Sequence, residues 1–267
     1  MLGVDASRAG WVGIELVDGV FAGAHLAASL ADLIDGAANP ATDPARRAAD
    51  PARRAADLAR RAADPATDRA RRATDLAGRY RVVGVDTPIG LLDAGWRDCD
   101  RLAAERIGRR RSSVFRVPPR GAWEPDEYPT ANARCRALTG AGFSRQAFNL
   151  RPRILEADAL HQSARPGAGV DRPGVVLYEV HPEVSFHALA KVELAYAKHS
   201  WAGHALRRSL LRSAGIELPD DLGEAGRAGP DDVLDAAAVA WTADRIARGV
   251  AGSLPDPPQH GHIAIWY

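Results

Sequence analysis

The sequence predicts an α/β fold in which a mixed sheet, with three antiparallel strands followed by parallel strands, is flanked by helices. Two observations predict this class. Three short apolar segments follow one another near the N-terminus with only turn residues between them, which is typical of antiparallel strands. The later apolar segments stand alone between helical stretches, which is typical of parallel strands joined by helices.

The antiparallel strands are expected at residues 2–5, 11–17 and 20–26, where apolar side chains are separated by short turns. Gly19 suits the second turn because glycine adopts left-handed backbone angles without strain. Ser29 is placed to cap a helix that follows the third strand, since its hydroxyl oxygen can accept a hydrogen bond from a free amide of the first helical turn.

The later elements alternate between single strands and helices. They are a strand at 80–86 that ends before Thr87 and Pro88, helices at 98–107 and 129–138, a helical stretch at 144–162 interrupted at Pro152, a strand at 175–181, and a helix from Pro230 to Gly249. This order of elements is that of the ribonuclease H-like fold. We expect residues 1–267 to form one such domain.

Residues 42–78 interrupt this pattern with a decaying seven-residue repeat of the type DPARRAA. The period matches a heptad, but the non-polar positions are almost all alanine and prolines recur, so a coiled coil is not expected. We interpret the segment as a low-complexity insertion exposed to solvent. The alternative is a basic arm that helps to hold a polyanion.

The composition is that of an ordinary globular protein, with 46% apolar and 26% charged residues. A formal net charge of +1 provides no overall positive field that would by itself indicate a nucleic-acid binder. Cys99 and Cys135 lack metal-ligand spacing, so neither a disulfide framework nor a cysteine zinc site is expected. Because neither a secretion signal nor a membrane-spanning run is recognisable, we expect a cytoplasmic protein with no membrane partner.

Two aspartates stand at the ends of apolar strands after the same dipeptide. Asp5 ends Gly-Val-Asp at 3–5, and Asp86 ends Gly-Val-Asp at 84–86. A buried carboxylate is costly unless it is paired or binds a metal. If the two strands are adjacent and parallel, their ends are about 4.8 Å apart and the carboxylates face each other. The alternative is that each accepts hydrogen bonds from turn amides.

Three further acids extend the pattern. Asp232 and Asp235 are three residues apart in the last helix, so both project from one helix face. Asp232 also lies in the first turn, where it can stabilise the helix terminus instead. Glu179, in the strand at 175–181, is either a further acid of the site or the partner of an arginine. An oxygen-only ligand set of this kind suits Mg²⁺ or Mn²⁺.

Seven separated motifs make the chain resemble the domain-of-unknown-function family 429, which is grouped with ribonuclease H-like nucleases. They are GVDASRAGWVG, VVGVDTPIGL, RRRSSVFRVPPRGA, SRQAFNLRPRILEAD, YEVHPEVSF, PDDVLDAAAVAWTA and the terminal IWY. The helix segment DDVLDAAAVA is also similar to the acidic helix of Holliday-junction resolvases. The chain departs from the family pattern at Arg153, where lysine is usual, in KHSWAG at 198–203, and in the insertion.

The resemblance implies a nuclease that hydrolyses phosphodiester bonds of DNA or RNA by a two-metal mechanism. The catalytic acids are then Asp5, Asp86, Glu179, Asp232 and Asp235, of which the four aspartates hold Mg²⁺ or Mn²⁺. Substrate contacts are expected mainly from the basic segment 97–120, which carries eight arginines against three acids. The expected substrate-binding residues are Arg110, Arg111, Ser112, Ser113, Arg120, Arg153 and His181. Trp11, Trp123, Trp201 and Trp241 are expected to pack in the core or in interfaces.

Two other classes of function stay open at this point. An ATP-binding phosphotransferase of the sugar-kinase or actin-like type would use an early strand aspartate before a phosphate-binding hairpin, and SRAG at 7–10 fits such a hairpin. Against it, no second glycine-rich phosphate loop follows. A non-catalytic scaffold that retained the fold is the other class, and the acids present at every expected position argue against it.

Deleting residues 42–78 is expected to leave the thermal unfolding midpoint nearly unchanged, because a segment of alanine and arginine buries too little apolar area to offset the entropy of ordering it. Calorimetry of the full chain and of the deletion variant measures this. Loss of the cooperative transition in the deletion variant would contradict the interpretation.

Overall fold

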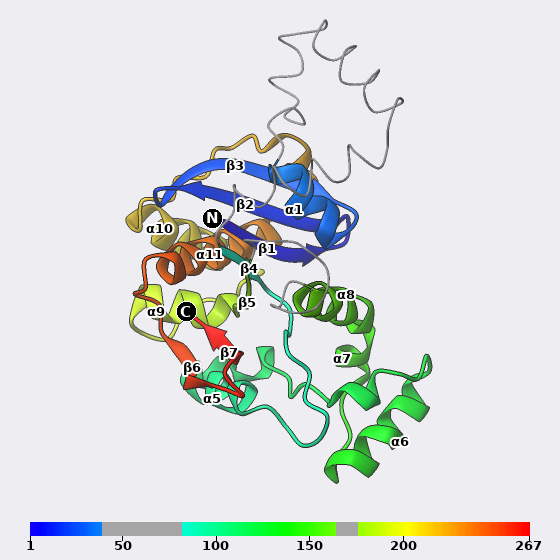
Figure 1. The fold of residues 1–267 in the computed structure, drawn as a ribbon. Helices are drawn as coiled ribbons and strands as arrows, with labels where there is room; N and C mark the ends of the chain where they lie inside the picture. Colours follow the sequence, from blue (N-terminus) through cyan, green and yellow to red (C-terminus); the bar gives the residue numbers. More distant parts are fainter. Residues whose placement is uncertain (39–81, 164–175) are drawn as a thin grey trace, which may run out of the picture.

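The computed structural model describes residues 1–38, 82–163 and 176–267 (Figure 1). The insertion expected at 42–78 lies outside the described residues, as do the first two residues of the strand expected at 80–86. Within the described part of the chain, no helix is long and apolar enough to cross a membrane.

A five-stranded mixed sheet with the strand order β3-β2-β1-β4-β5 forms the centre of the fold. Its strands are β1 (Leu2–Ser7), β2 (Gly10–Val17), β3 (Val20–Ala27), β4 (Val82–Val85) and β5 (Val176–Glu179). The first three strands are antiparallel, whereas β4 pairs parallel with both β1 and β5. The predicted α/β class and the change from antiparallel to parallel pairing are therefore confirmed.

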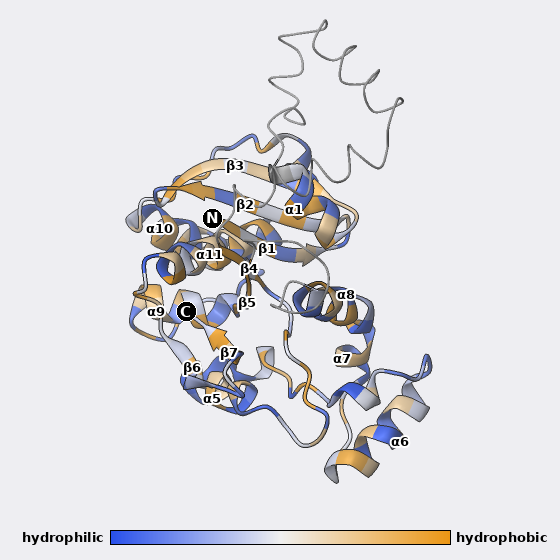
Figure 2. Ribbon diagram, in the orientation of Figure 1, coloured by the Kyte–Doolittle hydropathy of each residue, from blue (hydrophilic) through white to orange (hydrophobic). Residues whose placement is uncertain are grey.

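Helices cover both faces of this sheet. On one face, α11 (Pro230–Ala247) crosses β1, β2 and β4. On the other face, α1 (Leu30–Ala38) packs against β2 and β3, and α8 (Arg151–Ser163) packs against α1. Figure 2 shows hydrophobic residues concentrated along the strands, between these helical layers. Burial of this apolar surface is the main driving force for the fold.

The alternation of side chains along β1 assigns residues to the two layers. Leu2 and Val4 belong to the apolar cluster that includes Leu33 of α1. Gly3 points to the opposite face, where a β-carbon would lie 2.0 Å from the backbone nitrogen of Ala240 in α11. Because successive side chains of a strand point to opposite faces, Asp5 shares the α11 face with Gly3.

The remaining elements surround this centre. They are α5 (Asp98–Arg106), η2 (Gly108–Ser113), η3 (Arg120–Ala122), α6 (Tyr128–Thr139), α7 (Arg145–Asn149), α9 (Pro182–Ala190), α10 (Trp201–Ser213), η4 (Gly223–Arg227), β6 (Ser253–Gln259) and β7 (Ile263–Trp266). The β6–β7 hairpin packs on α5 and lies beside β5, with one parallel bridge from Val180 to Trp266. Figure 1 shows α6 and α7 at the opposite side of the molecule from α10.

The sequence misplaced some boundaries and missed some elements. The interruption expected at Pro152 falls at Leu150, and Pro152 lies in the first turn of α8, where its missing N–H costs no helix hydrogen bond. The strand expected to reach His181 ends at Glu179, because Pro182 begins α9 and His181 caps it. The helices α9 and α10 and the β6–β7 hairpin were not predicted.

Replacing Gly3 by alanine is expected to destabilise the fold by about 3 kcal/mol, because the new methyl group overlaps the backbone of α11 at Ala240 and at Ala236. The matched control is Gly36→Ala in α1, where an added β-carbon meets no atom within 4 Å. That variant should be neutral or slightly more stable. Urea unfolding compares both, and a Gly3→Ala variant as stable as the control would contradict the close packing of α11.

Candidate metal centre

The register of β1 and β4 places the first two aspartates side by side. Gly3 is opposite Gly84 and Val4 is opposite Val85 in the parallel pair. The amide of Asp86 continues this register by donating a hydrogen bond of 2.8 Å to the carbonyl oxygen of Val4. Asp5 and Asp86 therefore leave adjacent strands at the same level and on the same face of the sheet, as the repeated Gly-Val-Asp pattern predicts.

Helix α11 brings a third carboxylate to these two. Gly84, like Gly3, faces this helix, and a β-carbon there would lie 2.8 Å from a methyl group of Val239. The absence of side chains at both glycines lets the helix lie close to the strands. As a result, carboxylate oxygens of Asp5, Asp86 and Asp235 lie within 4.8 Å of one another. We call these three residues the aspartate cluster.

Burial and mutual repulsion make the aspartate cluster a poor place for negative charge alone. Burial raises the pKa of Asp5 well above its ordinary value, and the charges of Asp86 and Asp235 raise it further. Burial also raises the pKa of Asp86 to about 6. Asp235 is only 2% exposed, and its pKa is likewise raised by burial. Three carboxylates that repel one another are stabilised either by a proton or by a nearby cation.

The donor atoms of the aspartate cluster fit a hard divalent cation. All of them are carboxylate oxygens, which Mg²⁺ and Mn²⁺ prefer to nitrogen and sulfur. The buried Oδ1 atom of Asp235 has no hydrogen-bond partner in the described structure, so it is available as a ligand. Such an unsatisfied buried oxygen is costly unless a ligand or water completes it.

Lys198 is the cation that the structure places at the cluster. Its Nζ atom lies 2.7 Å from Oδ2 of Asp235, and its charge also acts on Asp5 and Asp86. This residue was missed as a member of the site because the contact joins α11 to a loop 37 residues earlier. One signal was available: Lys191 and Lys198 are the only lysines among the 35 lysines and arginines. Lysine is a compact point charge, whereas arginine is a broad planar fork.

Asp232 faces the same region but is engaged in helix capping. Its Oδ2 atom accepts a hydrogen bond of 3.3 Å from the amide of Gly229, the N-cap residue of α11. It is not among the three residues whose oxygens converge, although its charge contributes to the raised pKa of Asp5. Of the four aspartates predicted as metal ligands, the structure thus brings three together and gives the fourth a capping bond.

Glu179 lies on the opposite face of the sheet from the aspartate cluster. It is in register with Val85, whose side chain points away from that of Asp86. Its carboxylate is bound by the buried guanidinium of Arg97 at 2.7 Å and 2.8 Å and by the amide of Ile89. Of the two expectations for Glu179, the structure therefore shows the arginine partner and not an acid of the site.

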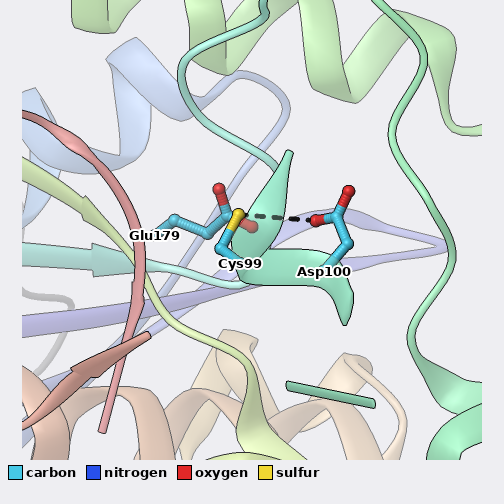
Figure 3. A group of neighbouring side chains, drawn as sticks. All are labelled: Cys99, Asp100 and Glu179. Atoms are coloured by element: carbon cyan, nitrogen blue, oxygen red, sulfur yellow. Dashed lines mark hydrogen bonds between the residues drawn. The ribbon is translucent and has the colours of Figure 1, made fainter. Parts of the chain in front are cut away.

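Glu179, Cys99 and Asp100 form a second group of potential metal ligands (Figure 3). Arg97 already supplies a positive charge to this group, because its guanidinium also donates to Asp100 at 2.5 Å. Burial raises the pKa of the Cys99 thiol well above its usual range, so this sulfur is protonated and poorly suited to bind a metal. We interpret the group as a buried ion-pair network.

His181 departs from the expected strand position but stays close to the cluster. Its Nδ1 atom accepts a hydrogen bond from the amide of Glu183, and its Nε2 atom lies 3.3 Å from the carbonyl oxygen of Ser113. A positive charge on His181 opposes the rise in the pKa of Asp86. The ring therefore joins η2 to the edge of the aspartate cluster.

Several of the predicted substrate-binding arginines hold the fold together. Arg110 donates to the carbonyl oxygens of Leu194 and Tyr196, in the loop that leads to Lys198. Arg120 pairs with Asp158 at 2.5 Å.

Arg153 donates to the carbonyl oxygen of Gly10 at 3.1 Å, and its guanidinium lies over the ring of Trp11. Arg111, Ser112 and Ser113 are exposed on η2. Trp11 and Trp123 are fully buried, as expected, but Trp201 is 89% exposed at the start of α10, three residues after Lys198. Trp201 therefore does not pack in the core, and its packing in an interface stays a prediction.

A family model matches residues 3–260, which is nearly the whole chain. The chain belongs to the family described as a protein of unknown function (DUF429). The matched range of this DUF429 protein includes β4, α11 and all of β1 except Leu2, and with them all three members of the aspartate cluster. No curated protein and no solved structure matches the chain.

Binding of Mn²⁺ is expected to weaken as the pH falls from 7.5 to 5.5, because protons and the ion compete for the same oxygens and the pKa of Asp86 is about 6. The stability of the metal-free protein should change in the opposite sense. A pKa raised in the folded state contributes stability at low pH that is lost as the pH rises through about 6.

Isothermal titration calorimetry with Mn²⁺ and thermal unfolding in EDTA measure the two effects. The Asp86→Asn variant is the control, since it should bind the ion weakly at both pH values and show a smaller gain in stability on acidification. Mn²⁺ affinity that is independent of pH, or higher at pH 5.5, would contradict the assignment.

Proposed function

We propose that this DUF429 protein has a ribonuclease H-like fold and is a metal-dependent phosphodiesterase that cleaves nucleic acid. The observation that carries the proposal is the convergence of Asp5, Asp86 and Asp235 from two parallel strands and one helix. Strands and helices hold side chains more precisely than loops do, which suits a site that must fix the position of an ion.

The charge and burial of each residue indicate a separate role in the proposed reaction. Asp5, Asp86 and Asp235 would hold Mg²⁺ or Mn²⁺, which when bound supplies an activated water and stabilises the leaving oxygen of a phosphodiester. Lys198, at 2.7 Å from Asp235, would orient that carboxylate and offer a positive charge to the phosphate. Asp232 would fix the start of α11 through its bond to Gly229.

The proposed hydrolysis requires no nucleophilic side chain. This agrees with the state of the two cysteine thiols, neither of which is suited to act as a nucleophile. Cys99 and Cys135 are both buried, and burial raises the pKa of each. A protonated, buried thiol is a weak nucleophile.

Asp86→Asn is expected to fold with unchanged or slightly higher stability at pH 7.5, because it removes one of three crowded charges. Cleavage should fall at least about 100-fold, since the ion that stabilises the transition state is held less well. The measurements are thermal unfolding and cleavage of single-stranded, duplex and branched DNA and RNA with Mg²⁺ or Mn²⁺. The matched control is Asp126→Asn, whose carboxylate is 89% exposed; it should retain activity.

Wild-type protein that neither cleaves any of these substrates nor gains stability from the metal would contradict the proposed function. Stabilisation by ATP in its place would favour the phosphotransferase.

A further inference from the structure

We propose that a cavity between α5, η2 and Glu193 binds backbone phosphates of the substrate on one side of the cleavage point, so that the substrate is a polynucleotide strand rather than a free nucleotide. This inference rests on the proposed function and names its substrate class. The cavity has a volume of about 1130 Å³. Its wall carries five arginines: Arg97, Arg101, Arg109, Arg111 and Arg116.

Three of the five arginines are neutralised by acids of the same region. Arg97 is bound by Asp100 and Glu179. Arg101 pairs with Glu105 at 2.8 Å, and Arg109 pairs with Glu193 at 2.8 Å. These pairs give the wall its shape, because each joins two segments or two turns of the wall, but they contribute little net charge to the cavity.

Arg111 and Arg116 are different. Within the described residues, no carboxylate pairs with either guanidinium, and both side chains are exposed. Arg116 is nevertheless held in place, since its guanidinium carbon lies 4.0 Å from the centre of the Trp96 ring. This contact with the ring restricts the guanidinium, whose planar N–H groups can bind phosphate oxygens bidentately.

The cavity adjoins the aspartate cluster through η2. On one side, η2 contributes Arg111 to the cavity. On the other side, the carbonyl oxygen of Ser113 lies 3.3 Å from Nε2 of His181. His181 follows Val180, whose amide donates a hydrogen bond of 3.0 Å to the carbonyl oxygen of Val85, the residue before Asp86. Arg110 binds the carbonyl oxygen of Leu194 in the loop that leads to Lys198. A strand with one phosphate at the aspartate cluster can thus pass over η2 and place later phosphates at Arg111 and Arg116.

Chemistry favours phosphate over other occupants of this cavity. The wall carries five arginines against the four acids Asp98, Asp100, Glu105 and Glu193, which leaves a net charge of +1. Within the described residues, only Arg111 and Arg116 lack a carboxylate partner, and such guanidinium groups bind an anion with several acceptor oxygens. A single carboxylate or one free phosphate would fill only a small part of a cavity of about 1130 Å³. Successive phosphates of a nucleic-acid backbone supply an anion for each of the two arginines, which is why the occupant is a strand.

The test compares a small diester with a polymer, using the double variant Arg111→Gln/Arg116→Gln. Hydrolysis of bis(p-nitrophenyl) phosphate with Mn²⁺ is measured in parallel and should fall by a smaller factor than strand binding, because this small diester cannot extend from the metal centre into the cavity. Binding of a 20-nucleotide single strand should weaken roughly 10- to 100-fold at low salt. The slope of the logarithm of affinity against that of salt concentration should fall by about 1.4, for two lost contacts.

The control is Arg212→Gln/Arg227→Gln, which changes net charge equally at two exposed arginines paired with Glu217 and Glu224. It should bind the strand like wild type. Equal weakening in both double variants, or none in either, would overturn the proposal, as would a nucleoside monophosphate that binds wild type as tightly as the strand. If wild type binds the strand through these arginines but cleaves no diester, the cavity stands and the proposed function fails.

Discussion

The close approach of α11 to β1 and β4 is the constraint on which the rest of the structure depends. It is possible because Gly3 and Gly84 present no side chain to the helix, so backbone packs on backbone at Ala240 and on Val239. The same glycines are two residues before Asp5 and Asp86. A strand that turns its glycine toward the helix must turn the aspartate toward the helix as well, because side chains alternate with a period of two.

Each Gly-Val-Asp segment therefore serves two purposes: its glycine allows the close packing of α11, and its aspartate supplies a carboxylate to the cluster. The apolar contacts of α11 with the sheet fix where its first turns lie, and Asp235 lies in that region, only 2% exposed. This arrangement is electrostatically unfavourable, because it buries three carboxylates close together. Their burial and mutual repulsion raise the pKa of each aspartate. Lys198 offsets part of the repulsion. A divalent ion would offset more, since it carries twice the charge and accepts several oxygen ligands.

The sequence was most informative where local pattern and topology agree. Repeated Gly-Val-Asp segments and a helix with acids three residues apart were sufficient to predict that Asp5 and Asp86 meet an acid of the last helix. They were not sufficient to separate Asp235, which joins the cluster, from Asp232, which does not. The sequence was least informative where the position of a residue depends on which strands pair and in which register. The face on which Glu179 lies follows from its register with Val85, and that register is a tertiary property.

The position of Lys198 at the aspartate cluster and the exposure of Trp201 were not predicted, for a related reason. Both belong to a loop and helix start whose position is set by contacts with η2 and α11, and neither lies in an element that the sequence pattern predicted. Which arginines make structural contacts and which stay available for a ligand was also not predictable from the sequence. Composition identified the basic segment 97–120, but only the structure separates Arg110 and Arg120 from Arg111. The first two bind backbone or acid partners, whereas Arg111 has no such partner among the residues that the structure describes.

The central claim is that the aspartate cluster is a site for a divalent cation, and a crystal grown with Mn²⁺ tests it most directly. The account predicts an anomalous-scattering peak at the manganese edge, bound by oxygens of Asp5, Asp86 and Asp235, with Glu179 still paired to Arg97. A fully ordered cluster that holds no ion at millimolar Mn²⁺, with Lys198 retained on Asp235 as its sole counter-charge, would contradict it.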